Sequence, residues 1–203
     1  MENTGNDSGT ISPEDAKKLE DAIKQKQIGA VRIYDGALSE EFCDELIEVF
    51  EANSENHEEV DNERIKFLNY RYSKFHGEEE VHENLKTHIM GLYEHYLGDL
   101  ELPNMIAHSG IESLSIKKYE QTEEEMIDPH IDAVDHKSAI RAIGFLFYLD
   151  NNKSMTNFPR QGIGVESIKG RVVIYPSTWE YPIIEKTPTD GSKYNLQTWL
   201  HYA

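Results

Sequence analysis

A short segment in the second half of the chain, Asp128-Pro129-His130-Ile131-Asp132, places an imidazole among carboxylates. On an extended chain, residues two apart project from the same face, so the side chains of His130 and Asp132 reach one point. One imidazole and one carboxylate together suit a divalent metal such as iron, which accepts mixed nitrogen and oxygen ligands. A His-x-Asp pair by itself is a weak signal, and a hydrogen-bonded surface pair is the alternative interpretation.

The elements that must position this pair divide between the two halves of the chain. Three helices are expected in the first half, because N-cap residues or an apolar stripe at helical spacing mark residues 13–27, the segment after Ser39, and residues 81–96. Apolar β-formers predict strands at 28–34 and 65–72. The acidic stretch 51–63 is expected to be a solvated loop.

From Ile111 onward the apolar residues recur with a period of two, which is typical of strands. The strand candidates are residues 111–119, 142–149, 172–175, 179–184 and 194–202. Helices in the first half and strands in the second predict an α+β protein. A β-sandwich or barrel backed by helices is the natural way to close so many short strands.

Composition limits the possible partners. Among 203 residues, 38 are acidic and 20 are basic, so the formal charge is −18, which disfavours binding to nucleic acid or to an anionic membrane. The single cysteine, Cys43, excludes an internal disulfide framework and a cysteine-based zinc site. Residues 1–10 are polar, and no apolar run reaches the length of a membrane span, so we expect a soluble, cytoplasmic protein.

Several motifs follow one another between Ile116 and Leu200. In chain order they are a strand ending in Tyr119, the His130-x-Asp132 pair, Arg141 with Tyr148-Leu149, Thr156-x-Phe158-Pro159, Lys169-Gly170-Arg171, Pro176-Ser177-x-Trp179, Gly191-x-Lys193-Tyr194 and Trp199. In identity, order and spacing this series resembles the prolyl 4-hydroxylase-like branch of the iron(II)/2-oxoglutarate-dependent dioxygenases, particularly the small microbial and viral forms. The resemblance covers about 85 residues.

The resemblance implies a double-stranded β-helix, or jelly roll, in the second half, backed by the helices of the first half. We therefore expect a disordered tail at 1–11 and one oxygenase-like domain at 12–203. Within that domain, residues 12–105 would provide helical support and residues 106–203 the β-helix core.

The same resemblance implies the roles of individual residues. His130 and Asp132 would be catalytic iron ligands, and Lys193 would pair with the distal carboxylate of 2-oxoglutarate, assisted by the hydroxyls of Tyr119 and Thr156. The implied cofactors are iron(II) and the co-substrate 2-oxoglutarate, with ascorbate as a further option. The implied reaction is hydroxylation of a peptide, a protein or an amino-acid side chain. A compact ammonium in an apolar barrel is a strong partner for a dicarboxylate.

One position of the iron site departs from the family pattern. The family completes its iron site with a second histidine, about ten residues before the lysine, and Ile183 occupies that position here. Glu185, Tyr181 and His136 are candidates for a replacement ligand. Alternatively, iron is held by His130 and Asp132 together with 2-oxoglutarate and water. A third possibility is a catalytically inactive β-helix protein that binds 2-oxoglutarate or a protein partner.

Overall fold

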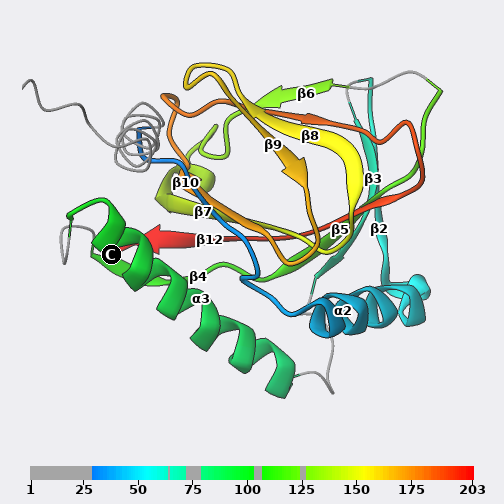
Figure 1. The fold of residues 1–203 in the computed structure, drawn as a ribbon, viewed down its shortest axis with the longest axis horizontal. Coiled ribbons are helices and arrows are strands. Elements are labelled where there is room, and N and C mark those ends of the chain that lie inside the picture. Colours follow the sequence, from blue (N-terminus) through cyan, green and yellow to red (C-terminus); the bar gives the residue numbers. More distant parts are fainter. Residues whose placement is uncertain (1–28, 64, 72–78, 103–106, 124–126) are drawn as a thin grey trace, which may run out of the picture.

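Two antiparallel β-sheets and two helices make up the computed structural model, which describes residues 29–63, 65–71, 79–102, 107–123 and 127–203 (Figure 1). The expected tail at 1–11 and the expected helix at 13–27 lie outside these residues. The helices are α2 (Glu40–Ala52) and α3 (Glu79–Asp99), and short 3₁₀ turns cover Ser54–Asn56 and Ser138–Ile140.

The larger sheet has eight strands. Seven lie in the spatial order β1 (Arg32–Tyr34), β10 (Val172–Pro176), β7 (Arg141–Tyr148), β12 (Lys193–Tyr202), β5 (Ser115–Tyr119), β3 (Lys66–Arg71) and β2 (Glu58–Asp61), and β4 (His108–Ile111) also pairs with β12. The smaller sheet contains β6 (Ile127–His130), β11 (Ile183–Lys186), β8 (Asn152–Phe158) and β9 (Ile163–Ser167), in that order.

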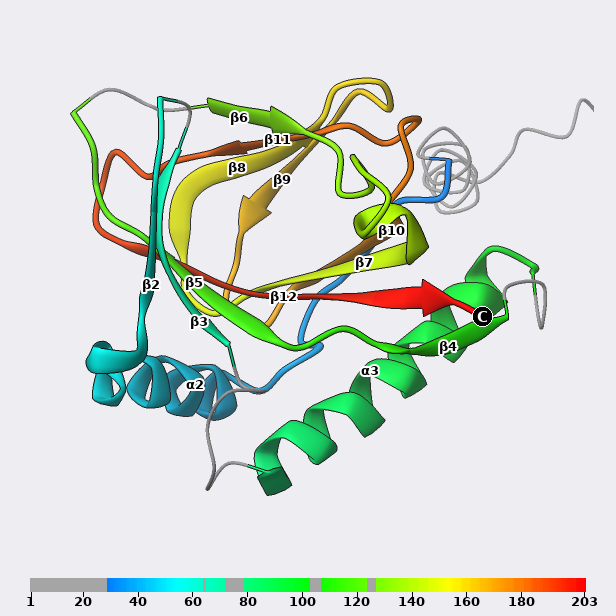
Figure 2. The same cartoon turned by 180° about the vertical axis from the view of Figure 1, so that it is seen from behind.

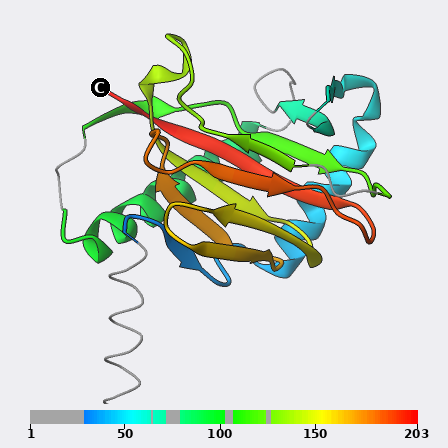
Figure 3. The ribbon, with the colours of Figure 1, turned by 90° about the horizontal axis from the view of Figure 1, so that it is seen from above.

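The elements form three layers. In both side views, α2 and α3 lie on one side of the larger sheet and the smaller sheet lies on the other (Figures 1 and 2). Seen from above, the short strands of the smaller sheet lie over the long strands of the larger one (Figure 3). This arrangement is the jelly-roll core, backed by helices, that the sequence predicts.

The alternating side chains of the larger sheet create two separate cores. In β7, Phe145 and Phe147 pack with the helices, whereas Leu146 and Tyr148 face the smaller sheet. Successive residues of a strand point to opposite faces, and this strand is apolar on both of them because both faces are covered. The core next to the helices is apolar. The core between the sheets also contains the polar residues of the candidate site.

The two helices form as predicted and bury their apolar faces. Ser39 caps α2, its hydroxyl accepting a hydrogen bond from the backbone N–H of Phe42 at 3.1 Å. Leu46 and Phe50 of α2 pack in the same core as Leu85 and Ile89 of α3. The two helices therefore support the larger sheet from outside, while β1, β2 and β3 of the first half are part of that sheet. This arrangement leaves the space between the sheets for chemistry.

Two predictions about local structure are wrong. Residues 51–63 are not simply a loop, because they contain the end of α2, a 3₁₀ turn and the edge strand β2. An edge strand tolerates many charged residues, so acidity did not exclude a strand. The strand expected at 179–184 begins only at Ile183. Before it, the backbone N–H of Tyr181 donates to the carbonyl of Thr178 at 2.9 Å in a turn.

Within the part of the chain that the structure describes, no helix combines the length and the apolar character needed to cross a membrane.

Candidate functional site

Polar side chains line the inner face of the larger sheet. On β12, Lys193, Asn195 and Gln197 alternate with residues that face the helices, and each of the three is at most 1% exposed. Lys193 lies directly opposite Tyr119 of β5 in the strand register. Buried polar groups in such a number need partners or a ligand, because an unpaired buried polar group is costly. The space between the sheets is therefore the candidate site.

His130 and Asp132 converge at one end of this space. His130 Nε2 lies 3.5 Å from Asp132 Oδ1. The other ring nitrogen, Nδ1, lies 2.9 Å from the carbonyl oxygen of Asp128 and 3.1 Å from its Oδ2. Because both of these atoms are acceptors, Nδ1 carries a proton, and Nε2 is the nitrogen available to a metal. A metal-binding histidine is commonly oriented in this way.

The electrostatics of the pair are those of a coupled acid and base. Burial lowers the pKa of His130, but hydrogen bonds to Asp128 and Asp132 raise it more, to about 10. Burial would raise the pKa of Asp132, but the hydrogen bond and charge of His130 lower it below its ordinary value. In the absence of a metal, the site therefore holds an imidazolium between two carboxylates.

A hydrogen-bonded chain fixes the orientation of Asp132. The hydroxyl of Tyr175 donates to Asp132 Oδ2 at 2.9 Å, and the side-chain amide of Gln197 donates to the Tyr175 oxygen at 3.3 Å. Lys117 Nζ in turn donates to Gln197 Oε1. Asp132 is 5% exposed, so these bonds determine which oxygen faces His130.

Ile183 lies directly opposite His130 in the antiparallel pairing of β6 and β11. Its side chain is 1% exposed and packs in the core between the sheets. A hydrocarbon at this position offers no lone pair to a metal. The place at which the family pattern has a second histidine is therefore next to the His130–Asp132 pair, and it is filled by an apolar group.

None of the three candidate replacement ligands joins His130 and Asp132. Glu185 is held by other partners further along β11, His136 is exposed, and the Tyr181 hydroxyl accepts a hydrogen bond from the backbone N–H of Ala30 at 3.2 Å. Among the residues placed in the structure, no group of three or more His, Cys, Asp or Glu side chains is arranged to hold a metal ion.

The residues expected to bind the co-substrate do gather. Lys193 Nζ lies 5.3 Å from the centre of the Tyr119 ring, and Thr156 lies opposite Glu185 in the pairing of β8 and β11. Lys193 is fully buried, and its ammonium makes no hydrogen bond within the described residues. Burial lowers the pKa of Lys193, and the nearby carboxylate of Glu185 offsets part of that effect.

Sequence reasoning missed several residues of this interior. Lys117, Tyr175, Asn195 and Gln197 were not identified from the sequence. A signal was present, because polar residues at alternate positions of β12 in an otherwise apolar strand indicate a polar inner face.

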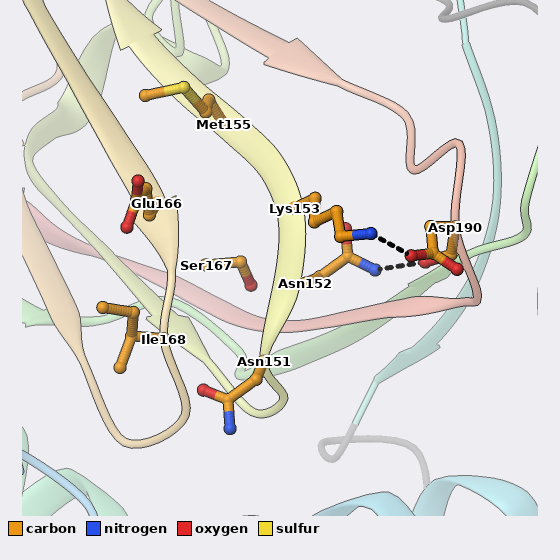
Figure 4. A pocket seen from close by; sticks show the side chains of 8 residues that line it. All are labelled: Asn151, Asn152, Lys153, Met155, Glu166, Ser167, Ile168 and Asp190. Atoms are coloured by element: carbon orange, nitrogen blue, oxygen red, sulfur yellow. Dashed lines mark hydrogen bonds and ion pairs between the residues drawn. The ribbon is translucent and has the colours of Figure 1, made fainter.

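A separate, open cavity of about 620 Å³ lies on the outside of the smaller sheet (Figure 4). Lys153 and Met155 of β8 line it, whereas Thr156 of the same strand is buried on the opposite face. At its rim, Lys153 Nζ pairs with Asp190 Oδ2 at 2.7 Å. This cavity is therefore not the space that contains His130 and Lys193.

Comparison with known proteins identifies the fold. No protein-family model and no curated protein sequence matches the chain. Solved structures do match. A prolyl hydroxylase from Trichoplax adhaerens, in complex with a peptide of the hypoxia-inducible factor oxygen degradation domain, has a TM-score of 0.69 and 16% identity. That match covers 95% of this chain and 94% of the other.

Two smaller enzymes are also similar. A Pseudomonas putida prolyl-4-hydroxylase has a TM-score of 0.66 and 12% identity, over 90% of this chain and 98% of its own. A viral collagen prolyl hydroxylase from Paramecium bursaria Chlorella virus-1, in a 2OG complex, has a TM-score of 0.62 and 17% identity, over 85% and 96%. The chain therefore has the prolyl 4-hydroxylase-like fold that the motif series indicates.

Proposed function

We propose that this protein is an iron(II)- and 2-oxoglutarate-dependent dioxygenase that hydroxylates a peptide, a protein or an amino-acid side chain. The observation that carries the proposal is the fully buried ammonium of Lys193, which makes no hydrogen bond to any described residue. The carboxylate of Glu185 interacts electrostatically with both Lys193 and His130, which links the ammonium to the candidate metal pair. Burying a cation without a hydrogen-bond acceptor is unfavourable, and a bound carboxylate would supply the acceptor.

The residues around Lys193 fit one end of 2-oxoglutarate. Thr156 Oγ1 is buried beside the Tyr148 hydroxyl and makes no hydrogen bond of good geometry among the described residues, so it can turn to a bound ligand as a second donor. The Tyr119 ring packs beside the ammonium. A carboxylate seated here would accept bonds from Lys193 and Thr156, which would satisfy both buried donors.

The His130–Asp132 pair fits a metal with mixed ligands. His130 Nε2 and Asp132 Oδ1 would be the donor atoms, while Asp128 keeps the proton on Nδ1 and Tyr175 holds the second oxygen of Asp132. When bound, iron(II) together with 2-oxoglutarate supplies the activation of dioxygen needed to hydroxylate a C–H bond. Asp132 is 5% exposed, whereas the side chain of His130 is 24% exposed and therefore open to a ligand from solvent.

The substrate class rests on likeness alone. The Trichoplax relative is bound to a peptide and the viral relative is described as a collagen prolyl hydroxylase. We therefore propose a peptide or protein segment as the substrate. The acidic surface, with its formal charge of −18, favours a neutral or basic segment over nucleic acid.

A specific observation favours a second candidate function. Because Ile183 is opposite His130, a metal would receive only two protein ligands at this position, and its affinity would be low. Changing a residue that hydrogen-bonds to a metal ligand typically lowers metal affinity roughly 10–100-fold. Loss of the ligand itself should lower metal affinity further. The second candidate is a catalytically inactive protein that binds 2-oxoglutarate or a protein partner.

One experiment separates the two functions. Iron(II) and 2-oxoglutarate are added to the protein without oxygen, and the visible charge-transfer absorption of the metal–keto-acid complex is recorded. The dioxygenase proposal requires this band, together with succinate formation when oxygen is admitted. Binding of 2-oxoglutarate in calorimetry without the band would support the inactive binder. Absence of both would contradict the dioxygenase and the binding of 2-oxoglutarate, and would leave binding of a protein partner as the alternative.

A further inference from the structure

A buried carboxylate occupies the centre of the candidate co-substrate site. Glu185 of β11 is 2% exposed and lies two residues beyond Ile183, on the same inward face of the strand. The Tyr119 hydroxyl donates to its Oε2 at 3.1 Å, and the side-chain amide of Asn195 donates to its Oε1 at 3.2 Å. Both oxygens therefore have partners contributed by the larger sheet.

These partners include a group that the resemblance assigns to 2-oxoglutarate. The Tyr119 hydroxyl has one proton and can donate it to one acceptor only. While that proton is given to Glu185, it is withheld from a bound co-substrate. The negative charge of Glu185 also acts on Lys193, for which it raises the pKa against the effect of burial.

The charges facing Glu185 determine what the site accepts. Lys193 and His130 both interact electrostatically with Glu185, and Asp150 and Lys117 interact with Lys193. A second carboxylate placed beside Lys193 would lie near the carboxylate of Glu185 within a buried space. Like charges in such a place repel strongly, because little water screens them.

We propose that Glu185 is an internal competitor of the co-substrate: its carboxylate takes the Tyr119 donor and opposes the distal carboxylate of 2-oxoglutarate, so that it sets the affinity of the site. This inference rests on the proposed binding of 2-oxoglutarate near Lys193. For the co-substrate to bind, the Glu185 side chain must lose the hydrogen bond from the Tyr119 hydroxyl or turn away from Lys193.

The test compares the affinity for 2-oxoglutarate of the wild-type protein and of E185Q. Titration calorimetry is performed on protein supplied with manganese(II), which substitutes for iron without turnover. Glutamine keeps the shape and an acceptor oxygen but removes the charge. We expect E185Q to bind at least about tenfold more tightly, the factor that corresponds to one pKa unit of charge interaction.

E120Q is the matched control. Glu120 follows Tyr119 directly, and its side chain is 55% exposed, so the substitution removes the same charge from the surface. E120Q should bind 2-oxoglutarate as the wild type does. E185V is a second variant, in which Tyr119 loses its acceptor entirely. Thermal unfolding of each variant verifies that it is folded.

Each outcome has a definite meaning. The competitor role is supported if E185Q or E185V binds 2-oxoglutarate more tightly than the wild type does. It is also supported if either variant binds 2-oxoglutarate and the wild type does not. Equal or weaker binding in folded variants, with binding intact in the wild type, overturns that role and leaves the proposed function standing. Manganese(II) binding is measured by electron paramagnetic resonance. Its loss in E185Q would indicate that Glu185 is a metal ligand and would also overturn the competitor role. Absence of binding in all variants contradicts the proposed function and the competitor role together.

Discussion

Ile183 and His130 face each other across the pairing of β6 and β11, so that a hydrocarbon lies directly beside the imidazole of the candidate metal pair. The motif series and the strand register lead to the same position independently. Counting about ten residues back from Lys193 leads to Ile183, where the family pattern has a histidine. The register of β6 and β11 puts the same residue next to His130. Replacing this one residue is therefore the most direct way to alter the metal chemistry of the site.

The first prediction is that I183H increases metal affinity. Histidine at this position would add a third ligand beside His130 and Asp132, and manganese(II) should bind at least about tenfold more tightly. Electron paramagnetic resonance of free manganese measures the affinity. I184H is the control, because Ile184 is the next residue and projects to the opposite face of β11. An equal gain in both variants would contradict the role assigned to position 183.

The second prediction concerns the buried ammonium. K193A removes the positive charge that would pair with 2-oxoglutarate, so binding measured by calorimetry should weaken by about a hundredfold or more, the scale of a lost buried charge pair. K153A removes a lysine that is exposed on the outer face of the smaller sheet and should leave binding unchanged. Unchanged affinity in K193A would show that the carboxylate site is elsewhere.

The third prediction follows from the raised pKa of His130. Since that pKa is about 10 in the folded protein and ordinarily 6.5, the folded metal-free protein holds a proton that the unfolded chain releases between these values. The resulting stability is complete below about pH 6.5 and is lost as the pH rises through about 10. Chemical denaturation across this range, together with nuclear magnetic resonance of the His130 ring, measures the effect.

D128N provides the comparison for that titration. The substitution removes the Asp128 carboxylate that lies beside His130 Nδ1 and keeps the backbone carbonyl. The pKa of His130 should fall, and the stability should decline at lower pH than in the wild type. An unperturbed His130 titrating near 6.5 in the wild type would contradict the geometry described for the pair.

The fourth prediction links packing to the site. A methyl group on Gly144 would lie 2.6 Å from the ring of Tyr175, whose hydroxyl holds Asp132. G144A should therefore displace that ring, destabilise the protein by about 1–3 kcal/mol, and weaken manganese(II) binding. Y175F removes the hydroxyl alone and should weaken metal binding with a smaller loss of stability. G110A, where a methyl group would have nothing within 4 Å, is the control for stability.

Periodic apolar patterns determined much of the fold at the level of sequence. The spacing of Leu85, Ile89 and Tyr96 predicted α3, and the apolar run ending at Leu149 predicted β7, because both elements bury continuous apolar faces. The strands β8 and β9 were not predicted as strands. Their buried residues include the polar Ser154, Thr156 and Ser167, and a strand that buries polar side chains lacks the apolar alternation that identifies strands.

The sequence alone also indicated which residues could carry the chemistry. The spacing of His130 and Asp132 is a local property of the chain, and the resemblance of the motif series to a known family added Lys193. Only the tertiary structure decided what surrounds them. The pairing of β11 with β6 and β8 put Ile183 beside His130 and brought Glu185 to Tyr119, a residue 66 positions away in the chain. Such contacts depend on the register between distant strands. That register follows from which face of each strand the assembled sandwich buries, so one segment considered alone does not reveal it.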